Sequence, residues 1–267
     1  MITPSDNDNF FPIFQSLLNC DEFTISCAPY EGVIGKVLSS LQRIDPTDTD
    51  WYSSKLNGAP ARVIDLMSGS GRLAFLAAQR GHRVTAFDNS PDIIAINRWA
   101  GQDVTFFLGD VLKEENGLDR GAADIVTCSG KSISLLSNSD RNLFYGSVRG
   151  ALRNGGLFFG DAYSQFTVES TTSNVVPLNL SAGRLLWSQA QTCPASSTMI
   201  TNFLLEPDYS IGDSQYRMLS YQRHWGITPS GLSRELAGHD LEVVEIVEDA
   251  TPGELPLDYF RFVAKAI

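Results

Sequence analysis

Short apolar runs alternate with amphipathic stretches through the middle of the chain. Several of these runs end at an acidic or small polar residue, as parallel strands do at a ligand-binding sheet edge. The predicted strands are residues 62–66, 82–87, 104–108, 124–127 and 157–160, and the predicted helices are 72–80, 91–100 and 139–153, the last stopped by Asn154-Gly155-Gly156. Strands that alternate with helices predict an α/β fold with a doubly wound, mainly parallel sheet.

The pattern changes after residue 163. Residues 164–182 are rich in serine, threonine and asparagine, and apolar alternation returns in three predicted strands at 184–192, 198–205 and 216–225. A helix at 229–237 and strands at 241–247 and 259–266 then bring the expected core sheet to seven strands. We therefore predict one domain, with a core of residues 61–163 and 227–267 and an antiparallel insertion at 164–226.

About sixty residues precede the first core strand. Residues 1–9 are polar and are expected to be loose, whereas 10–18 and 31–41 carry apolar residues at helical spacing. Residues 45–60 are rich in turn formers. We expect residues 1–60 to form an N-terminal helical lid over a ligand.

Composition narrows the classes of partner. The chain has 267 residues and a formal net charge of −11, which disfavours a nucleic-acid binder because such a protein needs a basic face. The four cysteines and three histidines show no metal-ligand spacing, and no apolar run is long enough to span a membrane. We expect a cytoplasmic protein that acts on a small molecule, without a metal, a nucleic acid or a membrane partner, and a homodimer is an open possibility.

The first core strand runs into a glycine-rich loop, Asp65-Leu66-Met67-Ser68-Gly69-Ser70-Gly71. Glycines allow the backbone to approach a ligand closely, and the helix that follows offers unpaired N–H groups. Gly69, Gly71 and Ala74 also fit a dinucleotide fingerprint. However, Asp65 gives no advantage beside a pyrophosphate, whereas it favours a positively charged ligand.

Three more polar segments end the next three strands, at Asp88, at Gly109-Asp110-Val111 and at Ser129-Gly130-Lys131-Ser132. With the glycine loop they form a four-part pattern that resembles the class I S-adenosylmethionine-dependent methyltransferase family. The likeness covers residues 60–162 and, more loosely, 232–267. It points to small-molecule members similar to glycine/sarcosine and amino-sugar N-methyltransferases. The resemblance implies a Rossmann-like methyltransferase fold and S-adenosylmethionine as cofactor.

The chemistry of that cofactor assigns roles to the strand ends. A ribose diol needs a bidentate acceptor such as Asp88, and adenine needs the donor and acceptor that Asp110-Val111 can supply. The resemblance also implies that the carbonyl of Cys128 or Ser129 lies near the ammonium group. The predicted cofactor residues are Asp65, Gly69, Ser70, Gly71, Asp88, Asn89, Asp110, Val111 and Ser129.

Structural roles remain open for three of these residues. Asp88 could only cap the following helix, Asp110 could only stabilise a turn, and Asp65 could only support the loop. The family usually has glycine and a small residue where this chain has Met67-Ser68. The bulky Met67 either packs under the loop or narrows the site beside the sulfonium.

The candidate catalytic residues are Asp161 and Tyr163 at a strand end and His224 after the third insertion strand. They could accept a proton, contact a cation and act as a base, respectively, but packing roles for Tyr163 and His224 remain open. The candidate substrate-binding residues are Tyr30, Lys131, Ser132 and Trp225. Lys131 suits an acceptor carboxylate, with a solvated loop lysine as the alternative.

These features predict an S-adenosylmethionine-dependent transferase that methylates nitrogen or oxygen of a small metabolite. In-line methyl transfer mainly needs alignment, so no strong catalytic motif is expected. Two alternatives stay open: an enzyme that transfers or cyclises the aminobutyrate arm and releases methylthioadenosine, as azetidine-carboxylate-forming relatives do, and a non-catalytic cofactor-binding subunit.

Overall fold

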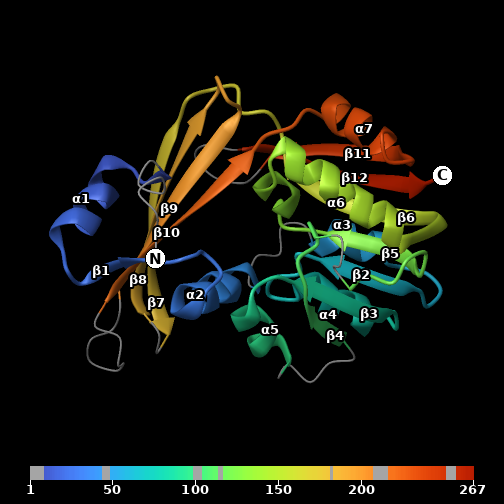
Figure 1. The fold of residues 1–267 in the computed structure, drawn as a ribbon, viewed down its shortest axis with the longest axis horizontal. Coiled ribbons are helices and arrows are strands. Elements are labelled where there is room, and N and C mark those ends of the chain that lie inside the picture. Colours follow the sequence, from blue (N-terminus) through green and yellow to red (C-terminus); the bar gives the residue numbers. More distant parts are fainter. Residues whose placement is uncertain are drawn as a thin grey trace.

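The computed structural model consists of two sheets with helices packed against them (Figure 1). It describes residues 9–43, 49–98, 104–113, 117–180, 183–206, 216–250 and 257–267. The larger sheet has helices on both faces, and the smaller one lies beside it (Figure 1). Of the segment 1–9 that was predicted to be loose, residues 1–8 lie outside the described residues.

The larger sheet has seven strands within the described residues, in the order β11-β12-β6-β5-β2-β3-β4. Their bounds are β2 Arg62–Leu66, β3 Arg83–Asp88, β4 Val104–Leu108, β5 Ala123–Cys128, β6 Leu152–Tyr163, β11 Leu241–Ala250 and β12 Asp258–Ala266. The strands β6, β5, β2, β3 and β4 are parallel, and β12 is antiparallel to both β6 and β11. The predicted seven-stranded, mainly parallel sheet is confirmed.

Helices cover both faces of this sheet because its strands are apolar on both sides. Ile64 and Val126 face one core cluster and their neighbours Val63 and Ile125 face the other. The first face is covered by α6 (Asn138–Ala151) and α7 (Pro229–Ala237), and the second by α3 (Thr49–Lys55), α4 (Arg72–Gln79) and α5 (Pro91–Arg98). No helix in the described ranges has the length and apolar character needed to cross a lipid bilayer.

The smaller sheet has the strand order β1-β10-β9-β8-β7. The bounds are β1 Thr24–Ser26, β7 Thr171–Leu180, β8 Gly183–Cys193, β9 Thr198–Glu206 and β10 Arg217–Trp225. Helix α1 (Pro12–Cys20) packs on one face of it and α2 (Gly32–Arg43) on the other. Neighbouring residues such as Leu204 and Leu205 therefore point to opposite faces, which lets one strand hold both helices.

Three features differ from the sequence-based expectations. Helix α6 ends at Ala151, and Asn154-Gly155-Gly156 lies within β6, where Gly155 has a φ of 75°. Strands β7 and β1 were not predicted, and α3 occupies part of the turn-rich segment 45–60. The end of the predicted helix 91–100 lies outside the described residues beyond Arg98.

Candidate functional site

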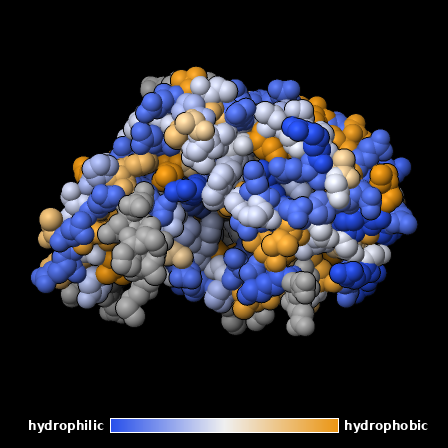
Figure 2. Space-filling model, turned by 45° about the horizontal axis from the view of Figure 1, so that its top comes forward, coloured by the Kyte–Doolittle hydropathy of each residue, from blue (hydrophilic) through white to orange (hydrophobic). Residues whose placement is uncertain are grey.

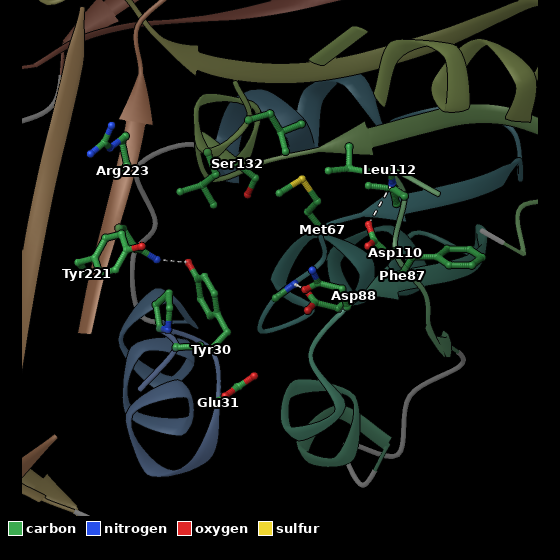
Figure 3. Close-up of a pocket in the computed structure, with 18 of the residues that line it drawn as sticks. Tyr30, Glu31, Met67, Phe87, Asp88, Asp110, Leu112, Ser132, Tyr221 and Arg223 are labelled. Carbon is green, nitrogen blue, oxygen red and sulfur yellow. Dashed lines mark hydrogen bonds between the residues drawn. The ribbon is translucent and has the colours of Figure 1, made fainter. Parts of the chain in front are cut away.

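A cavity of about 730 Å³ opens between the two sheets. Figure 2 shows a hollow in the surface between the two halves of the molecule. One wall consists of the ends of β2, β3 and β4, and the opposite wall consists of β10 and the segment between β1 and α2 (Figure 3). The lining residues are Ser26–Glu31, Met67, Gly69, Phe87–Asn89, Gly109–Leu112, Ser132, Leu135, Leu136, Tyr221–Arg223 and Trp225.

The backbone of Gly69 is held on both sides by side chains. Its N–H donates to Oδ2 of Asp88 at 2.8 Å, and its carbonyl accepts from Nδ2 of Asn97 at 2.6 Å. Gly69 has a φ of 50°, a left-handed conformation that suits glycine. The glycine loop is therefore fixed in position at the cavity wall.

Asp88 lies at the end of β3, where its carboxylate accepts from the N–H groups of Gly69 and Ser90. Burial raises the pKa of this carboxyl, and the N–H donors of Ser90 and Gly69 oppose the rise. Asp88 thus supports the loop and also lines the cavity, whereas the N–H of Ile93 in α5 donates to Oγ of Ser90, so Ser90 takes the capping position that the sequence left open for Asp88.

Asp110 and Val111 line the cavity at the end of β4. Oδ1 of Asp110 accepts from the N–H of Leu112 at 3.1 Å, which stabilises the turn. Asp88, Asn89 and Asp110 therefore give the lining a polar part along the ends of two neighbouring strands.

Four of the predicted cofactor residues do not line the cavity: Asp65, Ser70, Gly71 and Ser129. Gly71 has a φ of 72°, and a Cβ there would lie 2.9 Å from the ring of Phe75, so packing requires this glycine. The carbonyl of Ser129 accepts from Oγ of Ser132 at 2.7 Å. These four residues therefore lie behind the residues that line the cavity and help to hold the cavity wall in place.

Asp65 is 1% exposed, and its Oδ1 accepts from Oγ1 of Thr127 at 2.7 Å. Burial raises the pKa of this carboxyl to about 7, although Thr127 and Arg72 oppose the rise. An unfolded aspartate ionises near pH 4. Between about pH 4 and 7 the unfolded chain therefore loses a proton that the folded chain keeps, so folding stability falls as pH rises.

We expect Asp65→Asn to remove this pH dependence. From pH 5 to pH 8, the wild type should lose on the order of 2–4 kcal/mol of unfolding free energy relative to the variant. Urea titrations of both proteins at the two pH values measure this difference. Parallel pH profiles would show that Asp65 ionises normally.

The segment between β1 and α2 bridges the two walls of the cavity. Oη of Tyr30 accepts from Nε2 of Gln222 on β10 at 2.7 Å, as Figure 3 shows. The carbonyl of Tyr30 accepts from Oγ of Ser90, and the N–H of Gly32 donates to Asp92 at the start of α5. Tyr30 therefore lines the cavity opposite the strand ends, and its role in substrate binding stays a prediction.

Ser132 and Trp225 also line the cavity, but Lys131 does not. Nζ of Lys131 lies 4.4 Å from the centre of the Tyr259 ring, and its side chain is buried. The backbone N–H of Lys131 donates to Oδ1 of Asp161, which is fully buried. Lys131 and Asp161 therefore stabilise the loop behind the site in this structure.

Tyr163 and His224 pack edge to face, with ring centres 5.3 Å apart, and neither lines the cavity. Removal from water lowers the pKa of His224 to about 4, so the imidazole is neutral near pH 7. None of the three candidate catalytic residues contacts the cavity, and their catalytic roles stay predictions.

Several lining residues were absent from the sequence-based set. Glu31, Phe87, Leu112, Tyr221 and Gln222 are examples. Residues 26–31 reach the site because β1 pairs with β10, a contact between positions about 190 residues apart. No local sequence pattern predicts such a pairing. By contrast, Phe87 and Leu112 lie at strand ends and could have been included in the sequence-based set of site residues.

The residues present fit a phosphate-free adenosyl ligand. Asp88 provides acidic oxygens beside the cavity, and the backbone near Val111 borders it next to Asp110. The described lining contains the acids Glu31, Asp88 and Asp110 but only one basic residue, Arg223, which suits a cationic ligand better than a pyrophosphate. Among the described residues, no group of three or more His, Cys, Asp or Glu side chains is placed to hold a metal ion.

Comparisons with known proteins agree with this geometry. Residues 63–156 match the family model described as a methyltransferase domain. A ubiquinone biosynthesis O-methyltransferase from Xanthomonas oryzae pv. oryzae is 31% identical over 91 residues, which span 33% of this chain and 38% of that relative. The match therefore covers well under half of the curated relative.

Two solved structures share the fold. The CcbJ methyltransferase from Streptomyces caelestis has a TM-score of 0.64 at 20% identity, with 82% of this chain and 88% of that chain covered. CalS10, an amino pentose methyltransferase from Micromonospora echinaspora solved with S-adenosylmethionine bound, has a TM-score of 0.58 at 15% identity, with 97% and 98% covered. The domain match shows that residues 63–156 are similar to a methyltransferase domain, and the two solved structures share the fold over most of the chain.

Proposed function

We propose that this protein transfers a methyl group from S-adenosylmethionine to a nitrogen atom of a small metabolite. The observation that carries the proposal is the cavity between the two sheets, in which the polar strand ends of β3 and β4 face β10 and the Tyr30 segment. The first wall suits the cofactor and the second suits an acceptor. Oxygen is the alternative acceptor atom.

The order of the strands suggests how the cofactor lies. We assign adenine to the end of β4 near Asp110-Val111 and the ribose diol to Asp88 at the end of β3. Because β2 is the next strand in the sheet, the sulfonium end then lies over Met67–Gly69. The diol needs two acceptor oxygens, and Asp88 lies at that point with a carboxylate that the loop already orients.

The acceptor wall favours an amine. Tyr30 presents an aromatic ring, which stabilises the positive charge that develops on the nitrogen as it accepts the methyl group, and Glu31 adds a carboxylate to the lining. Among the described lining residues there is no histidine, the usual base for activating a hydroxyl group. A neutral amine needs no such activation, so nitrogen fits this lining better than oxygen.

The cofactor supplies a methyl carbon that a positive sulfur has already activated. The chain then has to align the amine with that carbon and exclude water. The Tyr30 segment serves this purpose in our proposal, because it is tied to β10 through Gln222 and to α5 through Ser90. We infer that residues 1–60 and 164–226 act as covers of a core formed by 61–163 and 227–267. A homodimer stays a prediction.

The test is to identify the nucleoside product. We expect incubation with S-adenosylmethionine and a panel of small amines, amino sugars and phenols to yield S-adenosylhomocysteine, detected by mass spectrometry, with an amine as the methylated acceptor. Methylthioadenosine as the product would instead support transfer or cyclisation of the aminobutyrate arm. Cofactor binding by calorimetry without any product across the panel would support a non-catalytic subunit.

A further inference from the structure

Met67 has a backbone conformation that is unfavourable for its side chain. Its φ is 53°, in the left-handed region that L-residues other than glycine, asparagine and aspartate rarely occupy. The described chain contains three other non-glycine residues with positive φ, Lys131, Ser197 and Asp240, and none of these lines the cavity. Strain of this kind persists at sites where the side chain has a role.

The side chain of Met67 lies between the two walls of the cavity. Figure 3 shows it projecting into the space between Asp88 on the strand-end side and Ser132 on the other, with its sulfur directed toward Ser132. The side chain is half-buried and also packs against the larger core cluster. It is therefore held in place, and it borders the part of the cavity between Asp88 and Ser132, which we call the passage.

A glycine at this position would adopt the same backbone without strain and would leave the passage open. The methionine side chain instead strains the backbone and narrows the passage. Its presence is explained if the size of the group that enters the passage has to be limited. Under the proposed function, the group that crosses this passage is the alkyl group on the cofactor sulfur, since the sulfonium end lies over the tip of β2.

We propose that Met67 is a specificity-determining residue that limits the size of the S-alkyl group the site can hold. This inference rests on the proposed function, because it needs the sulfonium over β2. It concerns the cofactor's reactive substituent and does not depend on the identity of the acceptor.

The experiment compares the binding of S-adenosylmethionine with that of its S-ethyl and S-benzyl analogues by calorimetry. We expect the wild type to bind the methyl compound at least tenfold more tightly than the benzyl compound. In Met67→Gly and Met67→Ala, this ratio should shrink at least tenfold because the passage widens. Met67→Leu, which has a similar volume, should keep the wild-type ratio.

Two further variants separate the effect of side-chain size at position 67 from the effects of backbone strain and of unfolding. Asp240→Gly relieves a positive φ of 54° far from the cavity lining, so it should leave the ratio unchanged. Met67→Asn has a short side chain that tolerates left-handed backbone, and it provides a second small variant if the glycine variant unfolds in a thermal melt.

The outcomes distinguish this inference from the function on which it rests. An unchanged ratio in folded small variants, or equal binding of the methyl and benzyl compounds by the wild type, would overturn the role of Met67 and leave the cofactor assignment intact. Failure of the wild type to bind S-adenosylmethionine at all would overturn the proposed function, and this inference with it.

Discussion

Replacing Asp88 with alanine should weaken the binding of S-adenosylmethionine by about a hundredfold or more. The substitution removes both acceptor oxygens from the ribose diol, and each hydrogen bond to a charged group contributes roughly 1.5–3 kcal/mol. It also leaves the N–H groups of Gly69 and Ser90 without the carboxylate that orients them. Calorimetric titration of the variant with the cofactor measures the loss.

A matched variant controls for the loss of negative charge. Asp119→Ala removes an exposed carboxylate that does not line the cavity, so it should bind the cofactor like the wild type. Affinity should also decline in the wild type as pH falls through the raised pKa of Asp88, because the protonated carboxyl accepts fewer hydrogen bonds. If Asp88→Ala and the wild type bound the cofactor with equal affinity, the assignment of the ribose diol to the end of β3 would be wrong.

The core sheet could be predicted because its signals are local. Each apolar run is bounded by residues that end a strand, and the glycine loop follows the first of them directly. The second sheet was predicted less completely. Strand β7 (Thr171–Leu180) lies at an edge and is largely exposed, so its sequence lacks the alternation that marks a half-buried strand.

The end of α6 was misplaced for a related reason. Asn154-Gly155-Gly156 has the composition of a helix end, but the chain passes into extended structure at Leu152, which pairs with Ala123. The positive φ of Gly155 belongs to an irregularity within strand β6 and does not end a helix. A glycine pair indicates unusual backbone, and tertiary pairing decides which kind.

Strand-end reasoning identified the edge of the sheet that lines the cavity but not the direction of each side chain. Asp88, Asp110 and Val111 reach the cavity, whereas Asp161 and Lys131 at neighbouring loops are buried behind it. The environment of Lys131 depends on Tyr259 of β12, 128 residues away along the chain. Such contacts are set by packing and leave no trace in local sequence.

Of the substitutions considered for stability, those at the partly buried ion pair between Arg141 and Glu235 should have the largest effect. Arg141 is 2% exposed, and its Nε and Nη2 donate to the two carboxylate oxygens of Glu235 at 2.9 and 3.1 Å. Nη1 also donates to the carbonyl of Leu136, which lines the cavity. The pair therefore joins α6 to α7 and holds the cavity loop.

We expect Arg141→Ala to lower the free energy of unfolding by about 2–4 kcal/mol, because it removes a buried side chain and leaves the partly exposed Glu235 carboxylate and the Leu136 carbonyl without their donor. Arg153→Ala breaks the exposed pair with Asp124 and should cost less than about 1 kcal/mol.

Urea denaturation of the wild type, both variants, Glu235→Gln and the double variant Arg141→Ala/Glu235→Gln closes a double-mutant cycle. Because Glu235 has one dominant partner here, the double variant should be little less stable than Arg141→Ala alone. Additive losses from the two substitutions would show that each side chain stabilises the fold independently of the other.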